Sequence, residues 1–190
     1  ALLYINETMS DSKYENADIY SDQVKHLLER GAKIDVIGIQ MHLARTHRNT
    51  EHVAQGKEFW TPERAYYIFD KLAENNLPLC MSETTITSPG SDYRGEMIQA
   101  IVATNLFRLW FRYPTMNSIN WWNLVDGWPQ ISDAIVDYNY CKKLAYHYIK
   151  RSQQPVVLAF DEPETDTAMT LYGVNDTTKD VTVSYRVRNI

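Results

Sequence analysis

The chain has 190 residues, of which 44% are hydrophobic and 23% are charged, so it is long enough and apolar enough to fold as a domain of ordinary size. Its net charge of −5 at pH 7 provides no basic surface for nucleic acid. No apolar run approaches the length of about 20 residues that crosses a bilayer. We therefore expect a soluble protein with no nucleic-acid partner and no membrane span.

Hydrophobic periodicity predicts four strand-helix units in succession. The predicted strands cover residues 2–6, 34–40, 77–82 and 118–122, and the predicted helices cover residues 18–30, 61–75, 92–112 and 140–151. In the second helix, Ala65, Ile68, Phe69 and Leu72 follow helical spacing and are predicted to form its core face. A strand followed by a helix four times over favours a parallel sheet in an α/β fold.

Beyond residue 154 the pattern changes to β-rich runs over residues 155–160, 168–174 and 181–187. These runs resemble the start of a β-sandwich, although an immunoglobulin-like sandwich needs about seven strands. We therefore expect an α/β domain over residues 1–154 and an incomplete sandwich over residues 155–190. Because the sequence opens within an apolar strand and ends within this sandwich, we also expect it to be cut at both ends.

Neither the cysteines nor the histidines predict a metal site or a disulfide framework. Cys80 lies in a predicted strand and Cys141 in a predicted helix, so both are expected to be core thiols. His42, His47 and His52 lack the spacing, cysteines or paired carboxylates of a familiar metal site. No glycine-rich turn follows a predicted strand to receive phosphates. We expect no metal and no cofactor.

Polar groups follow the predicted strands at similar points. Glu83 closes the strand over residues 77–82, where a carboxylate is well placed for catalysis, and Gln40 closes the strand before it. His42 follows Gln40 by two residues, so in an extended strand both side chains lie on one face. The alternatives are a solvated loop carboxylate or a partner of an arginine for Glu83, and an ordinary polar pair at a strand end for Gln40 and His42.

Four segments resemble motifs of glycoside hydrolase family 10, the endo-β-1,4-xylanases. They cover residues 3–6, 31–43, 77–83 and 122–126. In that family these motifs end barrel strands five to eight, in this order. Four strand-helix units alone suit either a doubly wound sheet or part of a (β/α)₈ barrel, which has eight. The resemblance implies the second half of the barrel, strands 5–8, followed by the start of a β-sandwich.

The resemblance also implies roles for individual residues. It makes Glu83 the catalytic nucleophile of a retaining glycosidase, which forms a glycosyl-enzyme while a second carboxyl protonates the leaving oxygen. It places His42 close to the nucleophile, where it can hydrogen-bond and orient the carboxylate, and Gln40 near the acid/base residue. No metal takes part in this implied site.

Aromatic and amide side chains are the implied substrate contacts. Trp122 matches the tryptophan that covers the sugar ring in the family, whereas Trp121 alternates to the opposite side and is expected to pack under the helices. Trp128 is a candidate for a second platform for sugar. Asn6 matches a family asparagine on strand five, but Glu7 and the next threonine replace the usual Asp-Tyr, which leaves the identity of the polysaccharide open.

The general acid/base of the family comes from a strand-four motif, and nothing before Leu2 supplies it here. Glu7 lies near the site in sequence, but no family match supports it as a substitute. We therefore expect the N-terminal half of the barrel on the same natural polypeptide, and we expect the chain alone to be inactive. The loop around residues 45–57, with Arg45, Arg48, Phe59 and Trp60, is expected to form one wall of a saccharide groove.

The implied substrate is xylan or a related β-glycan, and because a polymer of this kind cannot enter a cell, the implied location is extracellular, periplasmic or at the cell surface. Two alternatives remain open. One is another β-glycosidase with a barrel followed by a sandwich, such as the β-mannosidase-type enzymes of glycoside hydrolase family 2. The other is a non-catalytic carbohydrate-binding or scaffolding protein, which would lack the acid/base glutamate.

Overall fold

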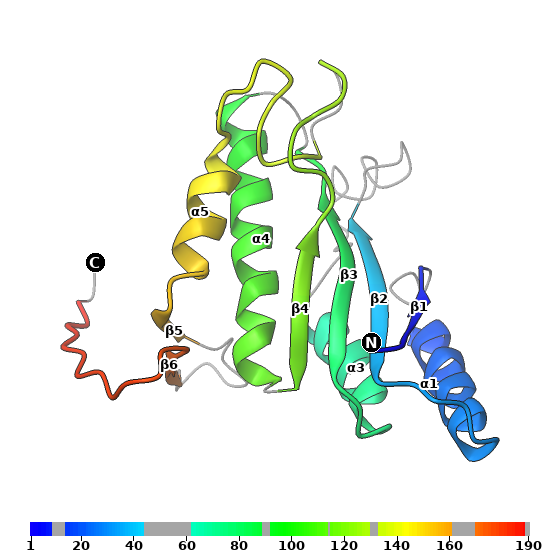
Figure 1. The fold of residues 1–190 in the computed structure, drawn as a ribbon. Coiled ribbons are helices and arrows are strands. Elements are labelled where there is room, and N and C mark those ends of the chain that lie inside the picture. Colours follow the sequence, from blue (N-terminus) through cyan, green and yellow to red (C-terminus); the bar gives the residue numbers. More distant parts are fainter. Residues whose placement is uncertain are drawn as a thin grey trace.

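The computed structural model describes residues 1–8, 14–43, 62–88, 92–113, 115–129, 133–160 and 170–188 (Figure 1). Its elements are β1 (Tyr4–Glu7), α1 (Tyr14–Glu29), β2 (Val36–Leu43), α3 (Pro62–Ala73), β3 (Leu79–Ile86), α4 (Tyr93–Arg112), β4 (Met116–Trp121), α5 (Leu144–Ser152), β5 (Val156–Phe160) and β6 (Leu171–Asn175). Four strand-helix units therefore follow one another, as the periodicity predicts.

The first four strands form one parallel sheet in the order β1-β2-β3-β4, which confirms the predicted parallel arrangement. Neighbours in sequence are neighbours in the sheet, and each connection passes through a helix (Figure 1). One boundary differs from the prediction in a way that matters. β3 continues to Ile86, so Glu83 lies inside the strand and not at its end.

The helices share a single hydrophobic core with one face of the sheet, here called the packed face. From β2, the side chains of Ile37, Ile39 and Met41 alternate into this core, and each is fully buried. The predicted face of α3 is confirmed, because all four of its residues are at most 2% exposed: Ala65, Ile68, Phe69 and Leu72. Apolar burial against the helices thus fixes which side chains of each strand point the other way.

The opposite face of the sheet, here called the polar face, carries hydrogen-bonding side chains. Several of its side chains contact one another between strands. The face comprises Asn6, Gly38, Gln40, His42, Cys80, Ser82, Glu83, Thr85, Ser118 and Asn120. Parallel strands covered on both sides usually read as continuous apolar runs. The alternation in β2 instead gives a sheet with one apolar, packed side and one polar side.

The segment before α5 is a closed turn and not the start of a helix. The Asp137 carboxylate accepts the backbone N–H of Cys141 at 2.7 Å, and Tyr140 has a left-handed φ of 64°. Because this turn satisfies backbone groups locally, α5 begins at Leu144, four residues later than predicted. Cys141 is consequently exposed, so its predicted burial is wrong, whereas Cys80 is buried as predicted.

The C-terminal segment holds a two-stranded antiparallel sheet of β5 and β6. The predicted third strand over residues 181–187 is wrong, since this segment is described without a ladder partner and its side chains are exposed. Alternating sequence alone does not form a strand when no neighbouring strand accepts its hydrogen bonds. No helix among the described residues is long and apolar enough to cross a membrane.

Candidate active site

One extra residue in β3 changes the direction of its side chains in mid-strand. Against β2, Met81 pairs with Ile39 and Glu83 pairs with Gln40, so Ser82 is the additional residue. The register between β3 and β4 shifts over the same stretch. A β-bulge of this kind re-aims the side chains that follow it. As a result, Ser82 and Glu83 both lie on the polar face, and the Glu83 carboxylate meets the polar side chains of β2.

Two side chains of β2 contact the Glu83 carboxylate. The Gln40 side chain donates from Nε2 to Oε1 of Glu83 at 3.0 Å, and Nε2 of His42 lies 3.1 Å from Oε2. His42 Nε2 also lies 3.2 Å from the Gln40 Oε1 atom. The side chains of both His42 and Glu83 are partly exposed, at 29% and 27%. The carboxylate is therefore oriented by two neighbours and still open to a ligand.

The second ring nitrogen of His42 connects this group to β4. Nδ1 lies 3.0 Å from Oγ1 of Thr85, and the Thr85 hydroxyl donates to the backbone carbonyl of Trp122 at 2.9 Å. The backbone N–H of Trp122 donates in turn to the Thr84 carbonyl at 2.8 Å, which extends the ladder by one residue beyond β4. Contacts thus run from Glu83 on β3, through β2, to the start of the loop after β4.

Asn6 lies on the polar face one layer below Gln40. Its Oδ1 accepts the Ser82 hydroxyl at 2.5 Å, a contact that reaches from β1 to β3 across β2. The residue of β2 beneath this contact is Gly38, and a Cβ atom there would lie only 2.7 Å from Asn6 Oδ1. Gly38 therefore leaves the space in which Asn6 holds Ser82, the extra residue of the bulge.

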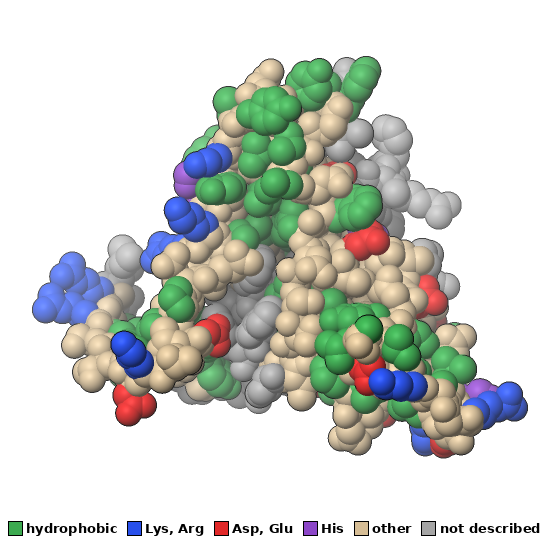
Figure 2. Space-filling view, in the orientation of Figure 1, with side chains coloured by type: hydrophobic (Ala, Val, Ile, Leu, Met, Phe, Trp, Pro, Cys, Tyr) green, Lys and Arg blue, Asp and Glu red, His purple; other side chains and the backbone are tan. Residues whose placement is uncertain are grey.

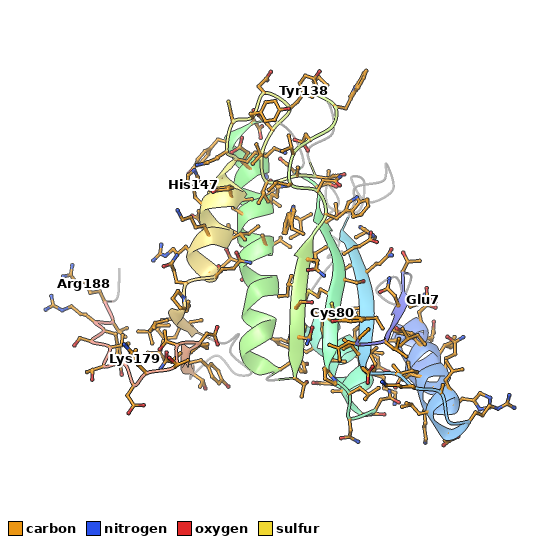
Figure 3. The ribbon with its side chains drawn as sticks, in the orientation of Figure 1. Glu7, Cys80, Tyr138, His147, Lys179 and Arg188 are labelled. Carbon is orange, nitrogen blue, oxygen red and sulfur yellow. The ribbon has the colours of Figure 1, made fainter. Side chains whose placement is uncertain are left out.

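The three tryptophans of this region differ in exposure, and the predicted packing of Trp121 is confirmed. Trp121 is partly buried and packs against the core, with its Nε1 atom buried and without a hydrogen-bond partner among the described residues. Trp122 is 50% exposed and Trp128 is 60% exposed. Figure 2 shows hydrophobic side chains gathered at the end of the molecule that carries the loop between β4 and α5. Tyr138 lies at the tip of this loop (Figure 3).

A buried ion pair fixes the base of that loop. Lys143 Nζ, just before α5, contacts the Asp126 carboxylate, and both side chains are at most 5% exposed. The other carboxylate oxygen of Asp126 accepts the backbone N–H of Ala134 at 2.9 Å. Each charge is therefore paired, which a buried charge requires. Sequence reasoning includes Asp126 in a motif but misses Lys143, because nothing in their spacing of 17 residues links them.

The structure brings Glu83, His42 and Gln40 into direct contact, and Thr85 links His42 to Trp122. Asn6 contacts Ser82, which precedes Glu83 in the chain. Trp128 has no such link among the contacts of the described residues. The intermediates, Thr85 and Ser82, are absent from the sequence predictions. Thr85 follows Glu83 by two residues, as His42 follows Gln40, so strand alternation alone is the signal that could have found it.

Glu7 faces away from the candidate site. It follows Asn6 in β1 and so points to the opposite side of the sheet, toward α1, whose Tyr20 hydroxyl donates to the Gly38 carbonyl at 2.8 Å. Burial, together with the negative charge of Glu7, raises the pKa of Tyr20. Figure 3 shows Glu7 at the β1 edge of the sheet, beside α1. This placement does not favour Glu7 as a catalytic acid.

Within the parts of the chain that the structure describes, no group of three His, Cys, Asp or Glu side chains could hold a metal ion. Several side chains considered in the sequence lie outside these parts. They are Arg45, His47, Arg48, His52, Phe59 and Trp60, so the predicted groove wall stays a prediction.

Solved structures similar to this chain share its fold. Native xylanase 10B from Thermotoga maritima matches with a TM-score of 0.65 and 22% identity over 80% of this chain and 46% of its own. A family 10 xylanase of Thermobacillus composti matches with a TM-score of 0.65 and 20% identity over 80% of this chain and 52% of its own. A family 10 structure from Paenibacillus barcinonensis matches with a TM-score of 0.64 and 21% identity over 83% of this chain and 47% of its own.

The chain therefore spans about half the length of these solved structures. Their likeness assigns the parallel sheet and its helices to part of an α/β TIM barrel. Among curated proteins, none matches the chain. The sequence profile described as Glycosyl hydrolase family 10 matches residues 1–152, which include all four strands of the sheet and the candidate site. On this match, the chain belongs to glycosyl hydrolase family 10.

Proposed function

We propose that the chain carries the nucleophile of a retaining endo-β-1,4-xylanase, and that Glu83 is this nucleophile. The observation that carries the proposal is a single carboxylate held on the polar face by the Gln40 amide at 3.0 Å and the His42 ring at 3.1 Å. Two such contacts fix the orientation from which an oxygen atom attacks a sugar carbon. Membership of the family and the xylanases among the similar structures support xylan as the substrate.

In the proposed reaction a Glu83 oxygen forms a bond to the anomeric carbon as the glycosidic bond breaks through an oxocarbenium-like transition state. A second carboxyl about 5 to 5.5 Å away protonates the departing oxygen and later takes a proton from the attacking water. His42 and Gln40 keep Glu83 in place through both steps. The second carboxyl is proposed to belong to the N-terminal half of the barrel, so residues 1–190 alone are expected to be inactive.

The proposed architecture follows from this division of the site. Strands β1 to β4 are assigned to barrel strands five to eight, so that residues 1–154 form the second half of the catalytic domain. Residues 155–190 are assigned to the start of an immunoglobulin-like sandwich. The polar face supports this assignment, because an inward-facing layer of hydrogen-bonding side chains suits a barrel whose other strands complete the site. The missing strands are proposed to lie on the same natural polypeptide.

Three further side chains are proposed to contact the polysaccharide. Trp122 is half exposed and is linked to His42 through the Thr85 hydroxyl, and it is proposed to offer a flat apolar surface to a sugar ring. Trp128, on the exposed loop, is proposed as a second aromatic surface. Asn6, which accepts the Ser82 hydroxyl, is proposed to bind sugar hydroxyls with its amide group. Because such a polymer stays outside the cell, an extracellular, periplasmic or surface location follows from the proposal.

The test is reducing-sugar release from xylan, glucomannan and aryl β-glycosides by the full-length gene product. Glu83→Gln is expected to lower kcat on xylan by at least about 10³-fold, because the amide removes the nucleophilic oxygen at nearly unchanged shape. The matched control is Glu74→Gln, which alters a largely exposed carboxylate paired with Lys71 on the surface and should leave kcat unchanged. Xylan hydrolysis that is indifferent to Glu83→Gln would refute the assignment.

A second readout in the same experiment tests the retaining mechanism. The anomeric proton of the first sugar released, followed by NMR before mutarotation, should report the β configuration. An α product would exclude a covalent intermediate at Glu83 and require an inverting mechanism. Absence of hydrolysis on every substrate by well-folded full-length protein would instead favour a binding or scaffolding role.

A further inference from the structure

The bulge in β3 decides on which face of the sheet each later residue of that strand lies. Before the bulge, Leu79 and Met81 are fully buried on the packed face, and Cys80 between them lies on the polar face. Continued alternation would put Ser82 on the polar face and Glu83 on the packed face, among apolar side chains. A slip by one residue moves every following side chain to the other face. The direction of the Glu83 carboxylate therefore depends on the bulge.

The residues that follow the bulge do not all favour the register that it creates. In this register Ile86 is buried, and the Glu83 carboxylate meets the polar side chains of β2. Thr84, however, is fully buried on the packed face, and its hydroxyl has no hydrogen-bond partner among the described residues. A buried hydroxyl without a partner is costly. Without the bulge Thr84 would turn to the polar face, so its side chain opposes the register in which Glu83 faces the site.

One side-chain contact holds the extra residue itself. The Ser82 hydroxyl donates to Oδ1 of Asn6 at 2.5 Å, from β3 to β1 across β2. Gly38 of β2 pairs with Asn6 and leaves the space for this contact, since a Cβ atom there would lie 2.7 Å from Asn6 Oδ1. In a strand without the bulge, Ser82 would take the place opposite Gln40 that Glu83 now occupies, farther along β2 from Asn6. The contact with Asn6 therefore favours the bulged strand.

We propose that Ser82 is a positioning residue, whose hydrogen bond to Asn6 holds the β3 bulge in the register that presents Glu83 to the polar face. The buried hydroxyl of Thr84 acts in the opposite direction. Ser82 acts through the backbone of β3, because its hydroxyl contacts Asn6 and not the carboxylate. The catalytic consequence rests on the proposed function, whereas the register of β3 does not depend on that function.

The matched variants are Ser82→Ala, which removes the hydroxyl, and Ser82→Thr, which keeps it. In the full-length gene product, Ser82→Ala is expected to lower kcat on xylan about tenfold with KM changed less than about twofold, because the carboxylate is aimed less often at the reacting carbon. Ser82→Thr should restore kcat to within about twofold of the wild type. A Ser82→Ala enzyme with wild-type kcat would overturn the proposal.

A second substitution separates control of the register from a general loss of stability. Thr84→Val removes the hydroxyl that opposes the bulge, so it should raise the midpoint of thermal unfolding. Added to Ser82→Ala, it should raise kcat again by at least about threefold, because both changes act on one register. The control is Thr104→Val on α4, whose hydroxyl donates to the Ala100 carbonyl at 2.8 Å, and which should bring neither gain. A double variant no faster than Ser82→Ala would show that Ser82 does not act on the register.

Hydrogen exchange tests the register without any activity. In full-length Ser82→Ala, the backbone amides of residues 83–86 should exchange at least about tenfold faster than in the wild type, while those of residues 79–81 keep their protection. Ser82→Thr should match the wild type. Unchanged exchange at residues 83–86 would contradict the proposal. If Glu83→Gln leaves xylan hydrolysis unchanged while Ser82→Ala still speeds this exchange, the proposed function fails and the role of Ser82 in the bulge stands.

Discussion

The two faces of the four-stranded sheet obey different rules, although the same strands build both. On the packed face, Ile37, Ile39 and Met41 are fully buried against helices, and their contribution is packing. On the polar face, Gln40 and His42 of the same strand contact a carboxylate and a hydroxyl of the next strand. Packing on one face fixes the register of the strands. Because of that register, the polar side chains on the other face lie next to one another.

The largest expected effect on stability is at the packed face, where a buried helix side chain should contribute far more to the free energy of unfolding than an exposed one. Ile68→Ala, at a fully buried position of α3, should lower the free energy of unfolding by about 2–5 kcal/mol, because it leaves a cavity in the core. Ile101→Ala, the same change at a position 48% exposed on α4, should cost less than about 1 kcal/mol. Urea unfolding of the full-length gene product measures both. Equal losses would mean that the assigned core does not carry the stability.

An intermediate loss of stability is expected at Gly38, where the backbone of β2 lies close to a side chain of the polar face. Gly38→Ala should cost about 1–3 kcal/mol, because the added methyl group lies 2.7 Å from Asn6 Oδ1 and 3.1 Å from the Ile5 carbonyl oxygen. The matched control is Gly173→Ala, where the nearest atom is a Leu158 methyl group at an ordinary 3.5 Å. Thermal unfolding of both variants decides the matter. A Gly38→Ala protein as stable as the control would show that the strand has room to shift.

The smallest effect concerns pH. Burial and the charge of Glu7 raise the pKa of Tyr20 above its ordinary value of 10.0, so the folded state holds the phenol proton more tightly than the unfolded state. This contribution to stability is complete below about pH 10 and is lost as the pH rises further. Tyr20→Phe should cost about 1 kcal/mol at neutral pH, through its lost bond to the Gly38 carbonyl, and should flatten the decline.

Denaturant unfolding of the wild type and Tyr20→Phe between about pH 8 and pH 11 measures this difference in slope. The wild type should lose stability more steeply than the variant at the upper end of this range. Parallel curves would show that Tyr20 is as easily ionised in the folded protein as in the unfolded chain, and would argue against its burial beneath β2.

Alternation and helical spacing predict most of the packed face, because apolar residue types at these spacings already indicate which side of a strand or helix is buried. The same alternation predicts that Gln40 and His42 share a face. It does not predict the bulge at Ser82, because the extra residue of β3 is defined only by its register with two neighbouring strands. The sequence therefore predicts Glu83 as a site residue but wrongly places it at a strand end, and it does not predict the contacts of Thr85.

The errors beyond the sheet have local causes. The Asp137 carboxylate accepts the N–H of Cys141 and closes a turn where helical spacing predicts a helix, which exposes a thiol expected in the core. Residues 181–187 alternate like a strand but have no ladder partner among the described residues. In both cases the outcome depends on hydrogen bonds that the sequence pattern does not specify. The turn before α5 makes one, and residues 181–187 show no ladder bonds among the described residues.

The ion pair between Asp126 and Lys143 has a consequence for ligand binding. It ties the start of the loop that carries Trp122 and Trp128 to the residue before α5, in a position shielded from water. Ordering this part of the loop costs conformational entropy. Because the ion pair orders it when the protein folds, a ligand that binds there does not have to offset that entropy loss. Under the proposed function, a saccharide that stacks on Trp122 would then meet a loop whose base is already ordered.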